Sequence, residues 1–279
     1  MIRKVIFGIF ISLLIVSCNK TYEQGMKSQD PAVILAAADQ MYEQEKWAYA
    51  IELYRKAASS YAGKVESERI AYNSAYANFN DKNYPLAAQQ FKNFYASFNR
   101  SDKAEEALFM SAYSYYQGSP EYNLDQSNTY DALRELQGFI DAYPQSDRVP
   151  EVNKYIDELQ HKLEKKAFEI AKAYYKTLKY KAATVSFANF LDDFPDSDYR
   201  EEAFMYLLRS RAELAIQSVY EKKENRLKDA ITAYRLFVKT YPNSEYKSEA
   251  EDWWNQLNNE TKSHKALMQQ VEANKKESK

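Results

Sequence analysis

The stretch ATVSFANFLDDFPDS, residues 183–197, decides the fold because its large apolar residues follow an alanine at fixed helical spacing. Ala183 is followed by Phe187, Phe190 and Phe194, four, seven and eleven positions later. Positions with this spacing lie on one face of an α-helix, so the stretch predicts an amphipathic helix. Proline cannot donate the next backbone hydrogen bond, so Pro195 ends the helix, and the Ser or Asp after it is placed to cap the next one.

The same alanine-aromatic frame occurs five times along the chain. The copies are Ala50 (Tyr54, Ala57, Tyr61), Ala87 (Phe91, Phe94, Phe98, Ser101), Ala132 (Leu136, Phe139, Tyr143, Pro144, Ser146), Ala183 (Phe187, Phe190, Phe194, Pro195, Ser197) and Ala230 (Tyr234, Phe237, Tyr241, Pro242, Ser244). Their alanines are separated by 37, 45, 51 and 47 residues. A helix that recurs at such a period is typical of a helical solenoid.

Each copy can be extended backwards to a partner helix with the tetratricopeptide (TPR) pattern of small and aromatic residues. When Ala183 is placed at position 20 of a 34-residue unit, Ala171 falls at position 8, where a small residue lets two helices approach closely. The sequence therefore predicts an all-α, TPR-type helical-hairpin solenoid of about five repeats, or about ten helices. A helix with Trp253 and Trp254 is predicted to cap its C-terminal end.

Spacings longer than 34 residues indicate insertions. One runs from Gly118 to Asn128, between the two helices of repeat three, and another lengthens residues 149–178 into one long helix, where Pro150 is tolerable in the first turn. Long insertions in a tight repeat are more often functional than random.

The composition agrees with an all-helical binding scaffold. The chain has 279 residues, with only 5 glycines and 7 prolines but 25 tyrosines and 14 phenylalanines. Little turn material remains for a many-stranded sheet. A formal net charge of −2, with acids and bases mixed along the chain, favours no nucleic-acid partner.

The N-terminus has the features of a lipoprotein signal peptide. Arg3 and Lys4 precede an apolar run at residues 5–16, which is too short for a membrane span, and Ser17-Cys18 follows it. We predict that residues 1–17 are removed and that Cys18, the only cysteine, becomes the acylated, palmitate-carrying first residue. The alternative is an incidental cysteine within a signal sequence.

The predicted organisation has five parts. After the signal peptide at residues 1–17 come a flexible leash (18–30), an N-terminal TPR module of repeats one to three (31–148), a C-terminal module of repeats four and five with the cap (149–260), and a polar tail (261–279), frayed or helical only on contact.

The sequence gives little reason to expect catalysis, and we predict a non-enzymatic protein without cofactor or metal. His161 and His264, the only histidines, lie on polar helical stretches without a cysteine or paired carboxylate at ligand spacing. We therefore expect both histidines at the solvated surface. The chain also has no glycine-rich phosphate loop.

Several of these features together resemble the BamD family, the lipoprotein subunit of the outer-membrane β-barrel assembly machinery. They are Ile15-Val16-Ser17-Cys18, the repeat ends of the form Tyr/Phe-Pro-x-Ser, the turn Asp81–Ala87 and the insertion at residues 120–129. The resemblance implies a scaffold anchored by lipid in the outer membrane, on its periplasmic face. It also implies docking on the POTRA domains of the barrel-forming subunit, mainly through the C-terminal repeats, and reception of unfolded outer-membrane proteins by the N-terminal repeats.

A candidate substrate-peptide groove follows from the TPR register. Helix positions that face the inside of a TPR array carry Arg69, Tyr72, Tyr76, Phe109, Tyr113 and Tyr116. An aromatic stripe with one arginine suits an extended, aromatic-rich peptide that ends in a carboxylate. The alternative is that these aromatic residues only pack between neighbouring helices.

Two other functions remain open at this stage. One is a periplasmic TPR adaptor of the envelope or division machinery, and the other is a surface lipoprotein that binds glycans on aromatic platforms. The partner that co-purifies from membranes would distinguish them.

Overall fold

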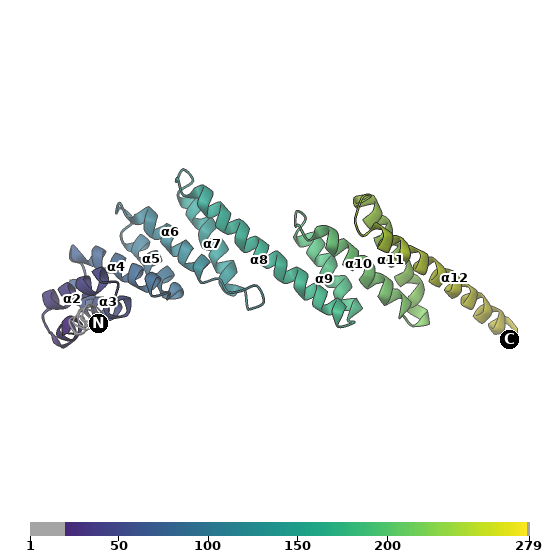
Figure 1. The fold of residues 1–279 in the computed structure, drawn as a ribbon, viewed down its shortest axis with the longest axis horizontal. Coiled ribbons are helices and arrows are strands. Elements are labelled where there is room, and N and C mark those ends of the chain that lie inside the picture. Colours follow the sequence, from purple (N-terminus) through teal and green to yellow (C-terminus); the bar gives the residue numbers. More distant parts are fainter. Residues whose placement is uncertain (1–19, 278–279) are drawn as a thin grey trace, which may run out of the picture. The chain divides into compact units, whose positions relative to one another are not determined.

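A computed structural model describes residues 20–277, in which helices and turns occur but no strand (Figure 1). Five helical hairpins follow one another along the chain. Their first helices are α2 (Pro31–Glu43), α4 (Glu66–Asn80), α6 (Ala104–Gln117), α8 (Val149–Lys176) and α10 (Arg200–Ile216). Their second helices are α3 (Trp47–Ala58), α5 (Tyr84–Ser97), α7 (Ser127–Ala142), α9 (Tyr180–Asp193) and α11 (Tyr220–Thr240). A short 3₁₀ turn, Ser59–Tyr61, follows α3, and α12 (Lys247–Glu277) comes last. The all-α hairpin prediction is confirmed.

The alanine-aromatic frame forms the contact side of every second helix. All five frame alanines are fully buried, as are Tyr54, Phe91, Phe139, Phe187 and Phe237. Removing one such aromatic side chain from water contributes about 1.5–3 kcal/mol, so the frame is a main source of stability. Tyr234 is only half-buried and stacks on Trp254, with the ring centroids 4.8 Å apart. The frame residues at the helix ends, Phe98, Tyr143, Phe194 and Tyr241, are also half-buried.

The ends of the second helices share one local geometry. α7, α9 and α11 each stop two residues before a proline, since the residue before proline disfavours helical backbone. The serine of each Pro-x-Ser then accepts the N–H two residues later. These bonds are Ser146 to Arg148 (3.1 Å), Ser197 to Tyr199 (3.2 Å) and Ser244 to Tyr246 (3.0 Å), and Ser101 does the same for Lys103 (3.1 Å). The serines thus fix the turn just before the next helix. The predicted Ser or Asp cap was wrong for α6 and α10, because their N-cap residues are Lys103 and Tyr199 and neither makes a side-chain cap hydrogen bond.

The helices divide into two compact units, residues up to Leu159 (unit 1) and from Gln160 onward (unit 2). In α8, Val152 and Leu159 belong to the core shared with α6 and α7, whereas Phe168 and Ala171 belong to the core shared with α9 and α10. The boundary thus lies within α8, eleven residues after the position predicted from the repeat lengths. The predicted long helix with Pro150 in its first turn is confirmed.

The segment predicted to be a flexible leash is largely a helix. Residues 20–27 are helical, and Tyr22 stacks on Tyr49 of α3 with ring centroids 4.4 Å apart and donates a hydrogen bond to Glu52. The Lys56 ammonium donates to the carbonyl oxygens of Gly25 (3.2 Å), in the last turn of this helix, and of Ser28 (2.8 Å), just after it. Cations at a helix C-terminus satisfy its free carbonyls. Residues 18 and 19 of the predicted leash lie outside the described residues.

The C-terminal tail also differs from its prediction. Helix α12 continues to Glu277, and His264 is only 7 % exposed, with its ring 5.2 Å from that of Tyr220. The expectation of a surface histidine was therefore wrong for His264. Helix α12 packs against α11, and this contact buries the imidazole. His161 is exposed, as predicted, and lies 3.4 Å from Glu164.

The insertion in repeat three is an ordered loop held by a buried glutamine. The Gln126 amide donates to the carbonyls of Glu121 (2.8 Å) and Leu124 (3.1 Å), and its oxygen accepts from Thr129 (2.7 Å). Gln126 and Thr129 are both buried. A loop whose buried polar groups are satisfied in this way keeps one conformation.

Candidate functional site

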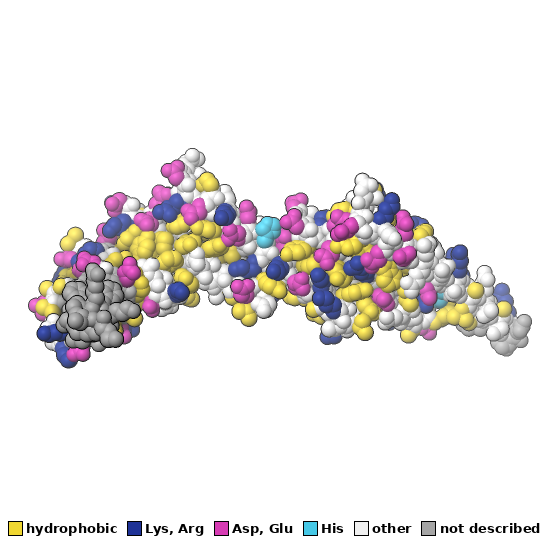
Figure 2. Space-filling model, viewed as in Figure 1, with side chains coloured by type: hydrophobic (Ala, Val, Ile, Leu, Met, Phe, Trp, Pro, Cys, Tyr) yellow, Lys and Arg dark blue, Asp and Glu magenta, His cyan; other side chains and the backbone are white. Residues whose placement is uncertain are grey.

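The aromatic residues predicted to line a groove lie on α4 and α6 of unit 1. Figure 2 shows hydrophobic side chains gathered on the face of unit 1 formed by these helices and the start of α8. We call Tyr72, Tyr76, Tyr113, Tyr116 and Tyr155 the aromatic face. All five side chains are half-buried.

Arg69, at the start of this region, already has a carboxylate partner. Its guanidinium lies 2.5 Å from Asp39 of α2. Asp39 also accepts a hydrogen bond from the Tyr54 hydroxyl at 2.8 Å, and Asn73 donates to that hydroxyl at 3.1 Å. The hydrogen bond to Asp39 raises the pKa of Arg69, so this guanidinium stays charged. A ligand carboxylate would have to compete with Asp39 for this arginine.

Tyr72 and Tyr76 pack against each other and against the second helix of their own hairpin. Their ring centroids are 4.9 Å apart, and Tyr72 lies 5.2 Å from Phe94. The Lys103 ammonium lies 4.8 Å from the Tyr72 ring centroid, a cation–π distance. The Tyr76 hydroxyl donates to Glu106 of α6 at 2.6 Å and so links two neighbouring hairpins.

On α6 the predicted residues divide between core and surface. Phe109 is only 4 % exposed and packs against Phe139, so it belongs to the core. This residue offers a ligand little surface. Tyr113 and Tyr116 lie 5.2 Å and 4.3 Å from the ring of Tyr155, and the Tyr116 hydroxyl donates to Glu158.

The phenol groups of Tyr72, Tyr76 and Tyr116 remain uncharged at physiological pH. Burial raises the pKa of Tyr72 to about 12 and that of Tyr116 to about 12. Burial and the hydrogen bond to Glu106 raise the pKa of Tyr76 further. The face therefore offers neutral rings with hydroxyl donors, and its negative charge comes from the carboxylates beside them.

Three contributors to this face were missed from the sequence: Tyr155, Lys103 and Arg148. Tyr155 continues the helical spacing at the start of α8, which the repeat assignment had not treated as a groove helix. Lys103 and Arg148 each follow a serine and an aspartate, and Arg148 lies 4.3 Å from the Phe109 ring centroid. The repeated Ser-Asp-cation triplet was the available signal.

Unit 2 has an analogous face with a different charge pattern. The Lys172 ammonium lies 5.0 Å from the Phe168 ring and 3.3 Å from Glu202. Arg209 lies 4.6 Å from the Tyr206 ring and pairs with Glu249 through two bonds of 2.6 and 2.5 Å. The cations here lie over the rings, and each has an acidic partner.

Between residues 20 and 277 no cluster of histidine or acidic side chains could hold a metal ion. Over the same range no helix combines the length and apolar character that crossing a bilayer requires. Cys18 and the signal peptide lie outside the described residues.

Comparison with known proteins places the chain in a family. The profile of the YfiO family, outer membrane lipoproteins, matches residues 27–227. The chain belongs to the YfiO family. A tetratricopeptide-repeat profile also matches residues 218–244 of this YfiO-family chain, a range that contains α11. The protein is therefore associated with the outer membrane and contains TPR repeats.

The individual proteins that resemble this chain share only low sequence identity with it. The outer membrane protein assembly factor BamD of Caulobacter vibrioides is 22 % identical over 179 residues, which cover 64 % of the YfiO-family chain and 58 % of the relative. The chain thus matches less than two thirds of that protein's length. Among solved structures, the TPR2AB-domain:pHSP90 complex of yeast Sti1 has a TM-score of 0.35 and 13 % identity, covering 95 % of this chain and 99 % of that chain.

Proposed function

We propose that this protein is a non-enzymatic lipoprotein subunit of the outer-membrane β-barrel assembly machinery. In this role it scaffolds the barrel-forming subunit through that subunit's POTRA domains and receives nascent outer-membrane proteins. The observation that carries the proposal is the YfiO-family match over residues 27–227, supported by a relative named as an outer membrane protein assembly factor. A stack of helical hairpins with large exposed faces suits such a scaffold.

The proposed anchor is Cys18. Acylation of a bacterial lipoprotein requires a cysteine, and the chain has no other. Several acyl chains on one residue give stable membrane attachment, which a single chain does not. Residues 1–17 act as the signal peptide, and the mature protein lies on the periplasmic face of the outer membrane. Mass spectrometry of the membrane-extracted protein should show an acylated residue 18, and Cys18→Ala should release the protein into the soluble fraction.

The proposed receiving surface is the aromatic face of unit 1. Its half-buried rings can stack with aromatic side chains, and its hydroxyls can bond to an extended backbone. Segments of unfolded barrel strands, in which aromatic and polar residues alternate, have the chemistry that fits this face. Arg69 would bind a terminal carboxylate by exchange with Asp39.

A peptide-binding measurement tests this surface. The probe is a synthetic peptide of alternating aromatic and polar residues with a free carboxylate. Tyr113→Ala should weaken binding about 2- to 10-fold, and Tyr72→Ala similarly, because one aromatic contact contributes about 0.5–1.5 kcal/mol. Arg69→Ala should weaken only the peptide with a free carboxylate. Tyr130→Ala, at a 60 % exposed site on α7, is the control. Unchanged affinity in correctly folded variants would reject the receiving surface.

A second experiment addresses the machinery. The protein purified from membranes should carry a β-barrel partner with POTRA domains. Recovery of a glycan-uptake porin would support the glycan-binding alternative, and absence of any barrel partner would contradict the proposal.

A further inference from the structure

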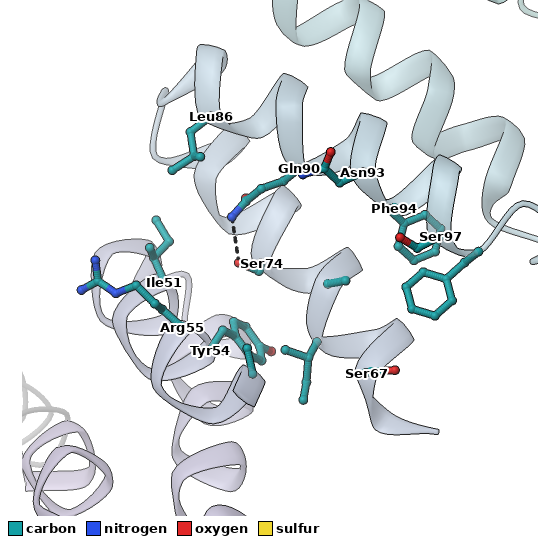
Figure 3. Close-up of a pocket in the computed structure, with 14 residues that line it drawn as sticks. Ile51, Tyr54, Arg55, Ser67, Ser74, Leu86, Gln90, Asn93, Phe94 and Ser97 are labelled. Atoms are coloured by element: carbon teal, nitrogen blue, oxygen red, sulfur yellow. Dashed lines mark hydrogen bonds between the residues drawn. The ribbon is translucent and has the colours of Figure 1, made fainter. Parts of the chain in front are cut away.

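A groove of about 410 Å³ lies in unit 1 between α3 and α5, with α4 as its floor (Figure 3). On α4 the floor residues Ile70, Ala71 and Ser74 lie about half a turn away from Tyr72 and Tyr76, given 3.6 residues per turn. The groove is therefore on the side of α4 opposite the aromatic face. Both surfaces can be occupied at the same time.

Comparison of neighbouring repeats explains why this space is open. The frame alanines Ala50, Ala87 and Ala132 lie at equivalent positions of α3, α5 and α7. The first pair of second helices, α3 and α5 with α4 between them, therefore corresponds to the second pair, α5 and α7 with α6 between them. In the second pair the space is filled by Leu108 of α6, which is 9 % exposed, and by Tyr95 of α5, whose ring lies 6.3 Å from that of Tyr143. The equivalent residues in the first pair are Ala71 and Ala58, which both line the groove. Two small side chains thus leave empty the volume that two large ones fill one repeat later.

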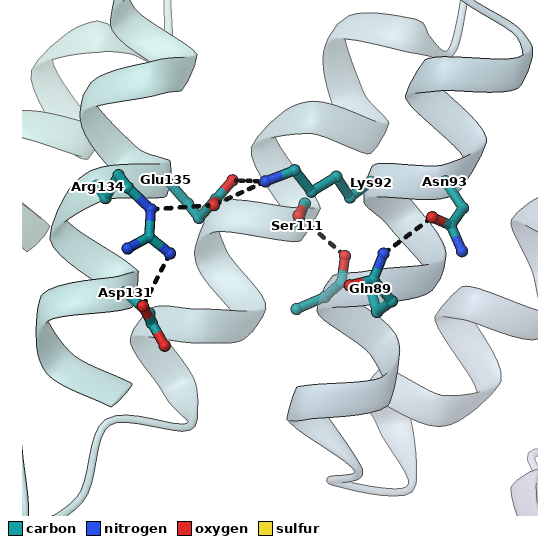
Figure 4. Close-up of polar contacts among 8 residues, drawn as sticks. Gln89, Lys92, Asn93, Ser111, Asp131, Arg134 and Glu135 are labelled. Atoms are coloured by element: carbon teal, nitrogen blue, oxygen red, sulfur yellow. Dashed lines mark hydrogen bonds and ion pairs between the residues drawn. The ribbon is translucent and has the colours of Figure 1, made fainter. Parts of the chain in front are cut away.

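The two pairs of helices also differ in their charged residues, because in the described part of the chain only the second pair contains an ion pair. Lys92 of α5 donates to both carboxylate oxygens of Glu135 of α7, each at 2.8 Å, and closes the second pair (Figure 4). In the first pair the lysine position holds Arg55 and the glutamate position holds Gln90. Among residues 20–277, Arg55 forms no ion pair, and it is the only charged residue of the groove lining. The first pair has the cation of the repeat but lacks its carboxylate.

The groove suits a helix better than an extended chain. Its α5 wall runs from Leu86 to Phe98, about 18 Å at 1.5 Å per residue. An extended segment would bury backbone N–H and C=O groups along this length, and burying them without hydrogen bonds is costly. Gln90 is already engaged, because its oxygen accepts from Asn78 (2.8 Å) and its nitrogen donates to Ser74 (3.4 Å), and the capacity left on one amide cannot satisfy a backbone of this length. A helix satisfies its own backbone and needs only apolar contact.

We infer that this groove binds an amphipathic α-helix of a partner protein, with its apolar stripe over Ala58 and Ala71 and an acidic side chain paired with Arg55. The partner helix supplies the two features that the α5–α7 pair contains within the chain: bulk in the position of Leu108 and Tyr95, and a carboxylate in the position of Glu135. This interaction is additional to the proposed reception of unfolded proteins, since it uses the opposite side of α4.

The test uses two model helices of about 14 residues, long enough for the 18 Å groove. Both have leucines at i, i+4, i+7 and i+11, and the flanking residues are glutamates in one and lysines in the other. The full chain should bind the glutamate helix at least tenfold more tightly than the lysine helix. Arg55→Glu should reverse that preference. The pair Ala58→Tyr and Ala71→Leu, which copies the filled α5–α7 space, should lower affinity for the glutamate helix at least tenfold.

Two further variants separate the groove from general effects. Gln90→Glu should create an internal ion pair with Arg55 and so remove the preference for the glutamate helix. It leaves the groove volume open, so it tests the charge interaction even if the double variant misfolds. Ala48→Tyr adds the same bulk at an exposed position of α3 outside the groove and should change nothing. Failure of the wild-type chain to bind the glutamate helix, equal binding of both helices, or full binding by the filled variant would overturn the inference.

Discussion

Three residues in the turns within hairpins adopt left-handed backbone although none is glycine. They are Glu45 (φ 56°), Lys82 (φ 62°) and Leu178 (φ 60°), and each follows the first helix of its hairpin. In each turn the next residue's N–H reaches back five positions, as from Asn83 to the carbonyl of Asn78 at 2.9 Å. This is the Schellman arrangement, which normally has glycine at the left-handed position. The chain therefore keeps local strain at three repeat turns.

Replacing Lys82 by glycine should relieve that strain. A side chain in left-handed backbone costs about 1–2 kcal/mol, whereas the extra freedom of glycine in the unfolded chain costs about 0.4–1 kcal/mol. Lys82→Gly should therefore stabilise the protein by up to about 1.5 kcal/mol in thermal or urea unfolding. Lys82→Ala keeps the Cβ atom and is the control. A Lys82→Gly variant that is less stable than Lys82→Ala by the full glycine cost of about 0.4–1 kcal/mol would show that the turn carries no strain.

The ion pair of Glu249 with Arg209 should make unit 2 sensitive to acid. The hydrogen bonds from Arg209 hold the pKa of Glu249 below its usual range. Because the folded-state pKa is lowered, the stabilisation is present above the ordinary glutamate pKa of about 4.3 and is lost as pH falls through the folded value. Glu249→Gln should reduce stability at neutral pH, and its difference from wild type should shrink toward pH 3. Glu251→Gln, at an exposed site of α12, should leave the acid limb unchanged.

Among the elements, the helix at residues 20–27 departs most from expectation. The segment was predicted to be a flexible leash, but Gly25 is buried, and a Cβ atom there would lie 2.7 Å from both Ala37 Cβ and Leu53 Cδ2. The glycine is needed for close approach of two helices and not for freedom of the backbone. Polar composition could not reveal this, because the docking depends on the positions of Tyr22 and Gly25 and on backbone carbonyls that Lys56 reaches.

The same substitution at two glycines should have opposite effects. Gly25→Ala should destabilise the docked helix by about 1–3 kcal/mol through overpacking. Gly138, in the middle of α7, has no atom within 4 Å of its hypothetical Cβ, so Gly138→Ala should stabilise the protein by about 0.5–1 kcal/mol. Hydrogen exchange at residues 20–27 should be faster only in Gly25→Ala. Unchanged protection of residues 20–27 in Gly25→Ala would mean that the close approach of Gly25 to α2 and α3 is not required for docking.

Element type was predictable because the frame repeats, whereas partners across elements were not. The spacing of Tyr72, Tyr76, Tyr113 and Tyr116 indicated the correct helix faces, since helical periodicity is a local property. It could not show that Asp39, thirty residues earlier, pairs with Arg69, because that contact depends on how neighbouring hairpins stack. The burial of Phe109 has the same origin.

At the scale of the whole molecule, the described residues divide into two units with separate cores. The core of unit 2 contains Phe187 and Phe237, and the cores of unit 1 contain Phe91 and Tyr54. In repeat arrays, stability is approximately a sum over repeats and nearest-neighbour contacts. A mutation in one core should therefore leave the other unit's local stability nearly unchanged, and α8 is the element in which this independence can be examined.

Phe187→Ala provides the measurement. Phe187 is fully buried, and truncation of such a residue costs about 3–5 kcal/mol. Native-state hydrogen exchange should show this loss in α9, α10 and the second half of α8, while amides of α4 to α6 keep their protection. Phe91→Ala should give the reciprocal pattern, with the loss in α4 to α6. Within α8, the effect of each variant on amide protection should change near Leu159, because the side chains of α8 divide there between the two cores. Equal loss of protection in both units from either variant would show that α8 joins them into a single cooperative unit.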